Sequence, residues 1–171
     1  MSRLLLIVVA AFLFFASPAC AQSKTFVSSE GRFSIDLGVK PTEVRNSAEA
    51  SVGGKKLWWK TGTSTFSVSY VDNPNATAER ANKAVHSSAD AYIAAIPRSA
   101  EVVSRNEIQL DGYPGVEVRS REPDGYTVVT RYYMAGTRLY CVMALWMAGA
   151  NDTVVLKTLD SFKVLKDEPP S

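Results

Sequence analysis

The sequence predicts an α+β domain in which an antiparallel sheet of about six or more strands lies between two helices. Short apolar or alternating runs, separated by turns that contain glycine and proline, recur from residue 100 to residue 146 and are typical of an antiparallel meander. Two other segments repeat apolar residues at steps of three and four, which indicates helices. The run 139–146 is apolar in both alternating sets, so a strand there must be covered on both faces.

The N-terminal half predicts two short strands followed by a hairpin. Glu30 and Gly31 interrupt the two short strands, and Gly62 lies at the turn of the hairpin. The polar stretch 40–54 between them contains no predicted element. The predicted strands span residues 26–28, 32–37, 55–61 and 63–71.

A long helix is predicted from residue 76 to residue 96. Asn73 and Pro74 end the preceding strand, and Pro97 ends the helix because a proline cannot continue it. Glu79 lies in the first turn, where a negative charge interacts favourably with the helix dipole. The residues of the apolar face are Ala81, Val85, Ala89, Tyr92 and Ile96.

The C-terminal half predicts four more strands and a terminal helix. The strands span residues 100–110, 116–121, 126–134 and 139–146. Asn151 or Asp152 is expected to cap the terminal helix. Its apolar stripe consists of Val155, Leu159 and Phe162. The two helices are therefore expected to pack on opposite faces of the sheet.

Residues 1–21 have the pattern of a secretory signal peptide. Arg3 gives a basic start, residues 4–15 are apolar, and Ala19 and Ala21 form the small-residue pair before a cleavage site. The apolar run is short for a membrane span, which takes about 20 residues. We therefore expect an exported protein, periplasmic or secreted, with one domain at 22–166, a flexible tail at 167–171 and no transmembrane segment after cleavage.

The two cysteines have different expected roles. Cys20 follows a small residue, as the lipidated cysteine of a bacterial lipoprotein does, so a lipid anchor at Cys20 is an alternative. Cleavage after Ala21 is favoured because Ser17 stands where lipoprotein signals prefer a large aliphatic residue. Cys141 lies in a strongly apolar strand and is expected to be a buried structural residue.

Composition and motifs exclude several functional classes. The formal net charge of +2 over 171 residues gives no drive towards nucleic acid. The single histidine, His86, is expected to be a partly exposed helix residue, and the chain has too few histidines and cysteines for a zinc site. No phosphate-binding or nucleophile-elbow motif is present, so no cofactor is predicted. A spatial pair of carboxylates stays open, although Asp111 and Asp124 are expected to serve turns.

The segment Lys55 to Lys60 supplies the first candidate contact surface. If it is a strand, Leu57 and Trp59 point to one face, and Trp58 points to the other face together with Lys56 and Lys60. Trp58 is then a candidate contact point for a partner or ligand. The alternative is that the lysine stems cover the indole ring, or that a helix packs on it.

Three arginines, Arg119, Arg121 and Arg131, supply the second candidate contact surface. These arginines have the outward position in the alternating pattern, opposite to that of Val116, Val118, Val128 and Tyr132. They would form a basic stripe beside Glu117. The stripe is either a solvated face with ion pairs or a site for an anionic ligand or partner.

Several short segments resemble a broad set of uncharacterised exported bacterial proteins with a PsbP/Mog1-like domain. The segments are 30–36, 68–70, 110–117, 131–133, 138–140 and 159–162. The resemblance covers nearly all of residues 26–165 and implies an antiparallel sheet between helices. It implies little about function, because PsbP is an accessory subunit of photosystem II and Mog1 is a GTPase partner.

The function expected from the sequence is that of an exported, non-enzymatic binding or accessory domain without a cofactor. Its partner would be a protein or small ligand of the cell envelope. The alternative is a cell-envelope hydrolase that uses carboxylate and arginine side chains. A lipid-anchored accessory subunit is a third interpretation.

Overall fold

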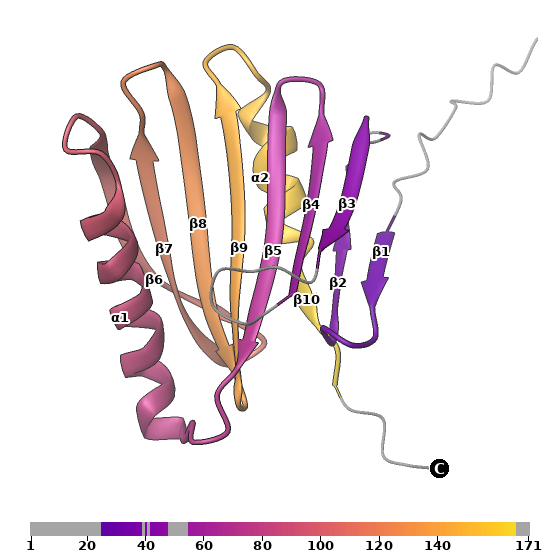
Figure 1. Ribbon diagram of the computed structural model, residues 1–171, viewed down its shortest axis with the longest axis vertical. Coiled ribbons are helices and arrows are strands. Elements are labelled where there is room, and N and C mark those ends of the chain that lie inside the picture. Colours follow the sequence, from indigo (N-terminus) through magenta and orange to yellow (C-terminus); the bar gives the residue numbers. More distant parts are fainter. Residues whose placement is uncertain (1–24, 39, 41, 48–54, 167–171) are drawn as a thin grey trace, which may run out of the picture.

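The computed structural model describes residues 25–38, 40, 42–47 and 55–166 (Figure 1). The predicted signal peptide and the predicted tail lie outside the described residues. The described chain forms a large antiparallel sheet with one long helix on one side and a short helix and a small sheet on the other (Figure 1). This confirms the predicted fold class.

The large sheet has seven strands in the order β3-β4-β5-β9-β8-β7-β6, and all its pairs are antiparallel. The small sheet has three strands in the order β1-β2-β10. The strands are β1 Thr25–Ser28, β2 Phe33–Asp36, β3 Glu43–Ser47, β4 Lys55–Thr61, β5 Ser64–Asp72, β6 Glu101–Leu110, β7 Tyr113–Arg121, β8 Tyr126–Ala135, β9 Arg138–Met147 and β10 Lys163–Val164. Two of them, β3 and β10, were not predicted from the sequence.

The two helices begin at side-chain caps. The hydroxyl of Thr77 accepts a hydrogen bond from the Arg80 N–H at the start of α1 (Ala78–Ala95). The side chain of Asn151 does the same for the Val154 N–H at the start of α2 (Asp152–Asp160), as the sequence predicted. Each cap satisfies a backbone donor that the first helical turn cannot satisfy by itself.

The α2 face of the large sheet contains the main core. Leu57 and Trp59 from β4 lie on this face with apolar side chains of β5 and β9. Val155 and Leu159 of α2, and Ile35 of β2, cover them and are 2% exposed or less. The core of the domain therefore lies between the large sheet and the layer formed by α2 and the small sheet.

The opposite face, here called the α1 face, has a smaller core. Val85 and Ala89 of α1 pack on Val116 and Val118 of β7 and on Met134 of β8. The helix packs chiefly against β7 and β8 (Figure 1). Strand β9 contributes Leu139, which is partly buried against this core. The two helices pack on opposite faces, as predicted.

Candidate functional site

Strand β4 separates two neighbouring tryptophans. Trp59 points to the α2 face, is 0% exposed and stacks on Phe66, with ring centroids 5.1 Å apart. Trp58 points to the α1 face and keeps part of its surface exposed. The alternation of side chains along a strand produces this difference, and the sequence predicted its direction.

Trp58 lies in a partly exposed group of side chains, called here the Trp58 face. In the sheet register, Trp58 is opposite Ser67 of β5, and Ser67 is opposite Met143 of β9. The Lys60 amino nitrogen lies 5.9 Å from the centroid of the Trp58 ring. The Trp58 face consists of Lys56, Trp58, Lys60, Thr65, Ser69, Met143 and Leu145, each of them partly or fully exposed. It combines an indole, two ammonium groups, hydroxyls and apolar side chains.

Cys141 lies on the α1 face between Ser69 of β5 and Tyr132 of β8. The expectation of a fully shielded residue was too strong, because Cys141 keeps intermediate exposure. Burial nevertheless raises the pKa of its thiol to about 11, although hydrogen bonds from Tyr132 and Ser69 act in the opposite direction. The thiol is therefore almost entirely protonated at neutral pH, which does not suit a nucleophile.

The three candidate arginines point to the α2 face, and they differ in exposure. Arg131 is opposite Val142 in the register, and only 12% of its side chain is exposed. Its guanidinium donates to Glu117 of β7 and to Asp160 of α2, both at 2.7 Å. The predicted outward direction of Arg131 is thus wrong, because both faces of this sheet carry packed elements. Arg131, on β8, therefore connects the end of α2 to β7 and β8 through these two ion pairs.

The other two arginines lie nearer the edge of the sheet. Arg121 donates to Glu101 at 3.2 Å, and both side chains are largely exposed. Arg119 is partly buried, opposite Val129 of β8. Because these arginines and Trp58 point to opposite faces, the two sets of candidate residues form two separate surfaces.

A cluster of polar and charged side chains that the sequence did not predict lies between α1 and β6. His86 Nδ1 is 2.8 Å from a guanidinium nitrogen of Arg105, and His86 Nε2 is 3.4 Å from Glu107 Oε1. Arg105 also pairs with Asp90 at 3.1 Å. The paired residues lie 15 to 21 positions apart in the sequence, on a helix and a strand, so only the fold brings them together.

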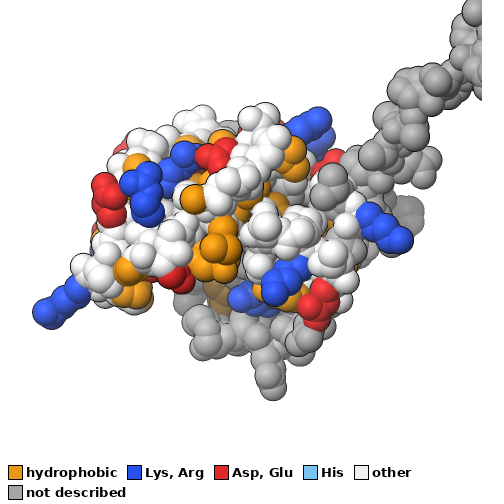
Figure 2. Space-filling model, turned by 90° about the horizontal axis from the view of Figure 1, so that it is seen from above, with side chains coloured by type: hydrophobic (Ala, Val, Ile, Leu, Met, Phe, Trp, Pro, Cys, Tyr) orange, Lys and Arg blue, Asp and Glu red, His pale blue; other side chains and the backbone are white. Residues whose placement is uncertain are grey.

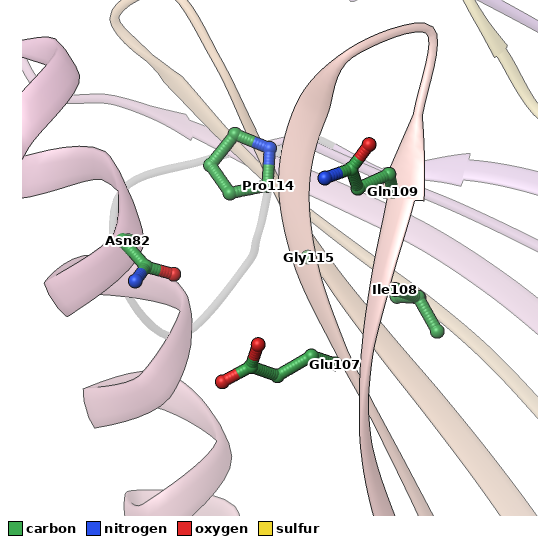
Figure 3. A pocket seen from close by; sticks show the side chains of 6 residues that line it. All are labelled: Asn82, Glu107, Ile108, Gln109, Pro114 and Gly115. Atoms are coloured by element: carbon green, nitrogen blue, oxygen red, sulfur yellow. The ribbon is translucent and has the colours of Figure 1, made fainter.

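A shallow hollow of about 530 Å³ adjoins this cluster. Asn82 of α1 and Glu107 of β6 point toward each other across it (Figure 3). The other residues that line it are Ile108, Gln109, Pro114 and Gly115. Its polar groups are amides and one exposed carboxylate, which bind by hydrogen bonding and supply no nucleophile.

Arg138 forms a second set of contacts that the sequence did not predict. It is 8% exposed, and its guanidinium donates to both carboxylate oxygens of Asp72 at 2.7 Å and to the Glu30 carbonyl oxygen at 2.6 Å. The hydrogen bond from Arg138 holds the pKa of Asp72 below its usual value, while burial acts against this shift. Tyr140 donates to the Gly31 carbonyl oxygen at 2.8 Å. These bonds fasten the turn between β1 and β2 to the large sheet.

The candidate carboxylates serve structural contacts in the structure. Glu117 is paired with Arg131, and Asp72 with Arg138. Asp124 accepts a hydrogen bond from the Tyr126 N–H at 3.5 Å within its turn. Asp111, with a φ of 51°, occupies a left-handed position beside Gly112 at the turn between β6 and β7.

Within the described ranges, no three His, Cys, Asp or Glu side chains gather in a group that could hold a metal ion. In the same part of the chain, no helix is long and apolar enough to cross a membrane. Seen from above, basic and acidic side chains are interspersed, and hydrophobic side chains reach the surface between them (Figure 2). This end of the molecule therefore has no charge field of a single sign.

Comparisons with known proteins identify the fold. No protein-family model matches the sequence, and no curated protein is significantly similar to it. Cyanobacterial PsbP (CyanoP) from Synechocystis sp. PCC 6803 matches with a TM-score of 0.55 and 14% identity, over 84% of this chain and 93% of that one. The fold is PsbP-like.

Two further solved structures match over a similar part of the chain. A protein from Bacteroides thetaiotaomicron VPI-5482 has a TM-score of 0.52 and 14% identity over 85% of this chain, which spans 50% of the length of the Bacteroides protein. A protein of unknown function from Pseudomonas aeruginosa has a TM-score of 0.47 and 8% identity, over 86% of this chain and 99% of that one. At these identities the PsbP-like likeness is a likeness of fold.

Proposed function

We propose that this protein is an exported, non-enzymatic binding domain that contacts a protein or small ligand of the cell envelope through the Trp58 face. The observation that carries the proposal is the partial exposure of Trp58 beside Lys56 and Lys60, next to a tryptophan that is wholly buried. Indole rings at surfaces are frequent anchors in interfaces because they bury a large apolar area and carry one polar group.

The composition of the Trp58 face indicates the chemistry of its partner. Lys56 and Lys60 lie on the same face as Trp58, and Lys60 approaches the indole ring. Met143 and Leu145 add apolar surface on β9, and Thr65 and Ser69 add hydroxyls on β5. A partner with an apolar group flanked by carboxylates would complement this arrangement.

The alternative of a hydrolase based on carboxylates and arginines has less support. Arg131 pairs with Glu117 and with Asp160 at 2.7 Å, and Arg138 pairs with Asp72 at the same distance. These ion pairs connect neighbouring secondary-structure elements, which gives the residues a structural role. Using them as catalytic groups would require breaking contacts that connect the layers of the domain.

Export is part of the proposal and is supported by the signal pattern of residues 1–21. Its test is the intact mass of the protein recovered from the producing cell. A mature chain that begins at Gln22 supports secretion without a lipid. A diacylated Cys20 would show that the protein is a membrane-anchored accessory subunit instead, and an unprocessed chain in the cytoplasm would contradict export.

Site-specific photocrosslinking tests the contact surface. A photoreactive amino acid at position 58 is expected to give a defined adduct in the native envelope, and the same group at Thr153, on α2, is the control. With the crosslinked partner purified, Trp58→Ala should weaken binding at least about tenfold, as for a central anchor of an interface. The double variant Lys56→Glu/Lys60→Glu should weaken it further, whereas Lys157→Glu on α2 should not. Equal binding by all three variants and the unmodified protein would refute the Trp58 face.

A further inference from the structure

Strand β6 forms one edge of the seven-stranded sheet. It is ten residues long, and β7 is its one neighbouring strand in the part of the chain that the structure describes. Among the described residues, no backbone group outside β7 hydrogen-bonds to it. Its side chains are mostly exposed, including Val102 at 39% and Val103 at 43%. An edge of this length presents a row of unpaired N–H and C=O groups that another strand can use.

Two charged side chains of β6 lie symmetrically about Asn106, whereas the third, Glu101, pairs with Arg121 of β7. Arg105 precedes Asn106 and Glu107 follows it. Arg105 and Glu107 both point to the α1 face, because they lie opposite Val118 and Val116 in the register with β7. The strand therefore carries one positive and one negative side chain on the same face, one residue to either side of a polar centre.

This arrangement is complementary to itself. When two such strands pair antiparallel about a two-fold axis at Asn106, Arg105 of each copy lies opposite Glu107 of the other. Both cross-strand contacts then join opposite charges, which stabilises a strand pair. Val102 lies opposite Leu110 in the same register, although the strand is irregular between Val102 and Ser104.

Neighbouring registers lack this complementarity. Moving the axis by one residue places Arg105 opposite Arg105 of the other copy, or Glu107 opposite Glu107. Like charges that face each other destabilise a strand pair. The charge pattern thus favours one register as well as one partner.

We propose that β6 pairs antiparallel with β6 of a second copy of this chain about a two-fold axis at Asn106, so that the two large sheets form one continuous sheet. Such an isologous contact closes on itself and leaves no unpaired β6 edge. The α1 helices of both copies lie on the same face of the joined sheet. Contacts from His86 and Asp90 already hold the side chains of Arg105 and Glu107 on that face.

The strength of the dimer follows from its components. Exposed ion pairs contribute little individually, so most of the affinity comes from the backbone hydrogen bonds of the paired edges. The ion pairs decide the register, and salt screens them. We expect a dimer that dissociates on dilution and weakens as the salt concentration rises.

Charge reversal tests the pairing, with the dissociation constant measured by analytical ultracentrifugation. Arg105→Glu places carboxylates opposite each other twice per dimer and should weaken it about tenfold, and Glu107→Arg should do the same with guanidinium groups. The double variant Arg105→Glu/Glu107→Arg restores opposite charges and should recover affinity close to that of the unmodified protein. Circular dichroism and urea unfolding show that each variant is folded.

A cysteine at the axis tests the register. Paired residues of antiparallel strands have Cα atoms about 4.5–5.5 Å apart, within the range of a disulfide. Asn106→Cys should therefore give a disulfide-linked dimer on mild oxidation. Ser104→Cys on the same face is the control, because its two copies would be separated by about 13 Å along the strands. The unmodified protein shows the background from the native cysteines.

The possible outcomes separate clearly. Dimerisation that follows the charge cycle, with crosslinking at position 106 only, supports the proposal. A protein that is monomeric at every concentration at which it stays in solution refutes it. A dimer indifferent to both charge reversals, or one that crosslinks through position 104 and not through 106, refutes the β6 register.

Discussion

Replacing Arg138 by methionine should destabilise the domain far more than replacing an arginine in an exposed ion pair. Arg138→Met keeps an apolar stem over the Tyr70 ring, which the guanidinium now contacts at 4.5 Å, and removes only the charged group. The change deletes two hydrogen bonds to the Asp72 carboxylate and one to the Glu30 carbonyl oxygen.

The magnitude follows from these contacts. A hydrogen bond to a charged group contributes about 1.5–3 kcal/mol, but Asp72 is 55% exposed and recovers hydration when its partner is removed. The three bonds therefore do not add fully, and we expect a loss of about 2–4 kcal/mol in the free energy of unfolding. Arg121→Met is the matched control. Its pair with Glu101 is exposed on both sides, so we expect a loss of about 0–1 kcal/mol.

The measurement is urea unfolding followed by tryptophan fluorescence. The free energies of the variants are compared with the same dependence on urea concentration for each. The pH dependence gives a second test. The pKa of Asp72 is lowered in the fold, so the contribution of its charge is complete above the ordinary carboxyl pKa of 3.8 and is lost as the pH falls through the folded value. The difference between the unmodified protein and Arg138→Met should therefore shrink below pH 3.8. Equal losses of unfolding free energy for Arg138→Met and Arg121→Met at neutral pH would refute the idea that the hydrogen bonds of Arg138 hold the turn between β1 and β2 on the large sheet.

Three further predictions concern the two faces of the large sheet. Trp59→Ala should lower the free energy of unfolding by about 3–5 kcal/mol. Trp59→Phe should lower it much less, because the indole N–H has no hydrogen-bond partner among the described residues. Equal losses of the two variants in thermal melts would contradict this. Gly115→Ala should lower the free energy of unfolding by about 1–3 kcal/mol, because the added Cβ would lie 2.7 Å from the Tyr132 carbonyl oxygen. An unchanged urea midpoint would show instead that β7 and β8 can move apart to accommodate the methyl group. Burial raises the pKa of the Cys141 thiol from 9.0 to about 11, so at pH 8 the folded protein should carry about 100-fold less thiolate than an ordinary thiol. Cys141 should therefore react slowly with a polar thiol reagent. Rapid labelling of the folded protein would contradict this burial.

Alternation along the strands allowed much of the fold to be predicted from the sequence. A period of two residues separates Trp58 from Trp59 without knowledge of any other strand. The same reasoning applied to 139–146 showed that both faces of the sheet are covered. Strand β3 was not predicted because it lies in a polar stretch. Strand β10 was not predicted because it has two residues and pairs with β2, which is distant in the sequence.

Alternation states which residues share a face, but where one of those faces carries polar side chains it does not state whether that face is covered. Arg131 does lie opposite in direction to Val116 and Val118, as the pattern indicated. The inference that this direction leads to solvent failed, because α2 brings Asp160 against it. The hydrogen bonds of Arg138 were not predicted for a related reason, because its partner Asp72 is 66 residues away in the chain.

The two proposals depend on opposite ends of one sheet, and this makes them independent. Strand β4, which carries Trp58, is separated from β6 by β5, β9, β8 and β7. With neighbouring strands about 4.8 Å apart, Trp58 and Arg105 are separated by roughly 24 Å across the sheet. This distance exceeds the range over which exposed charges interact at physiological ionic strength, about 8 Å. A charge reversal at Arg105 should therefore leave the binding of a partner to a single Trp58 face unchanged. A monomeric protein that binds through Trp58 would refute only the β6 pairing, and a dimer that binds nothing through Trp58 would refute only the proposed contact surface.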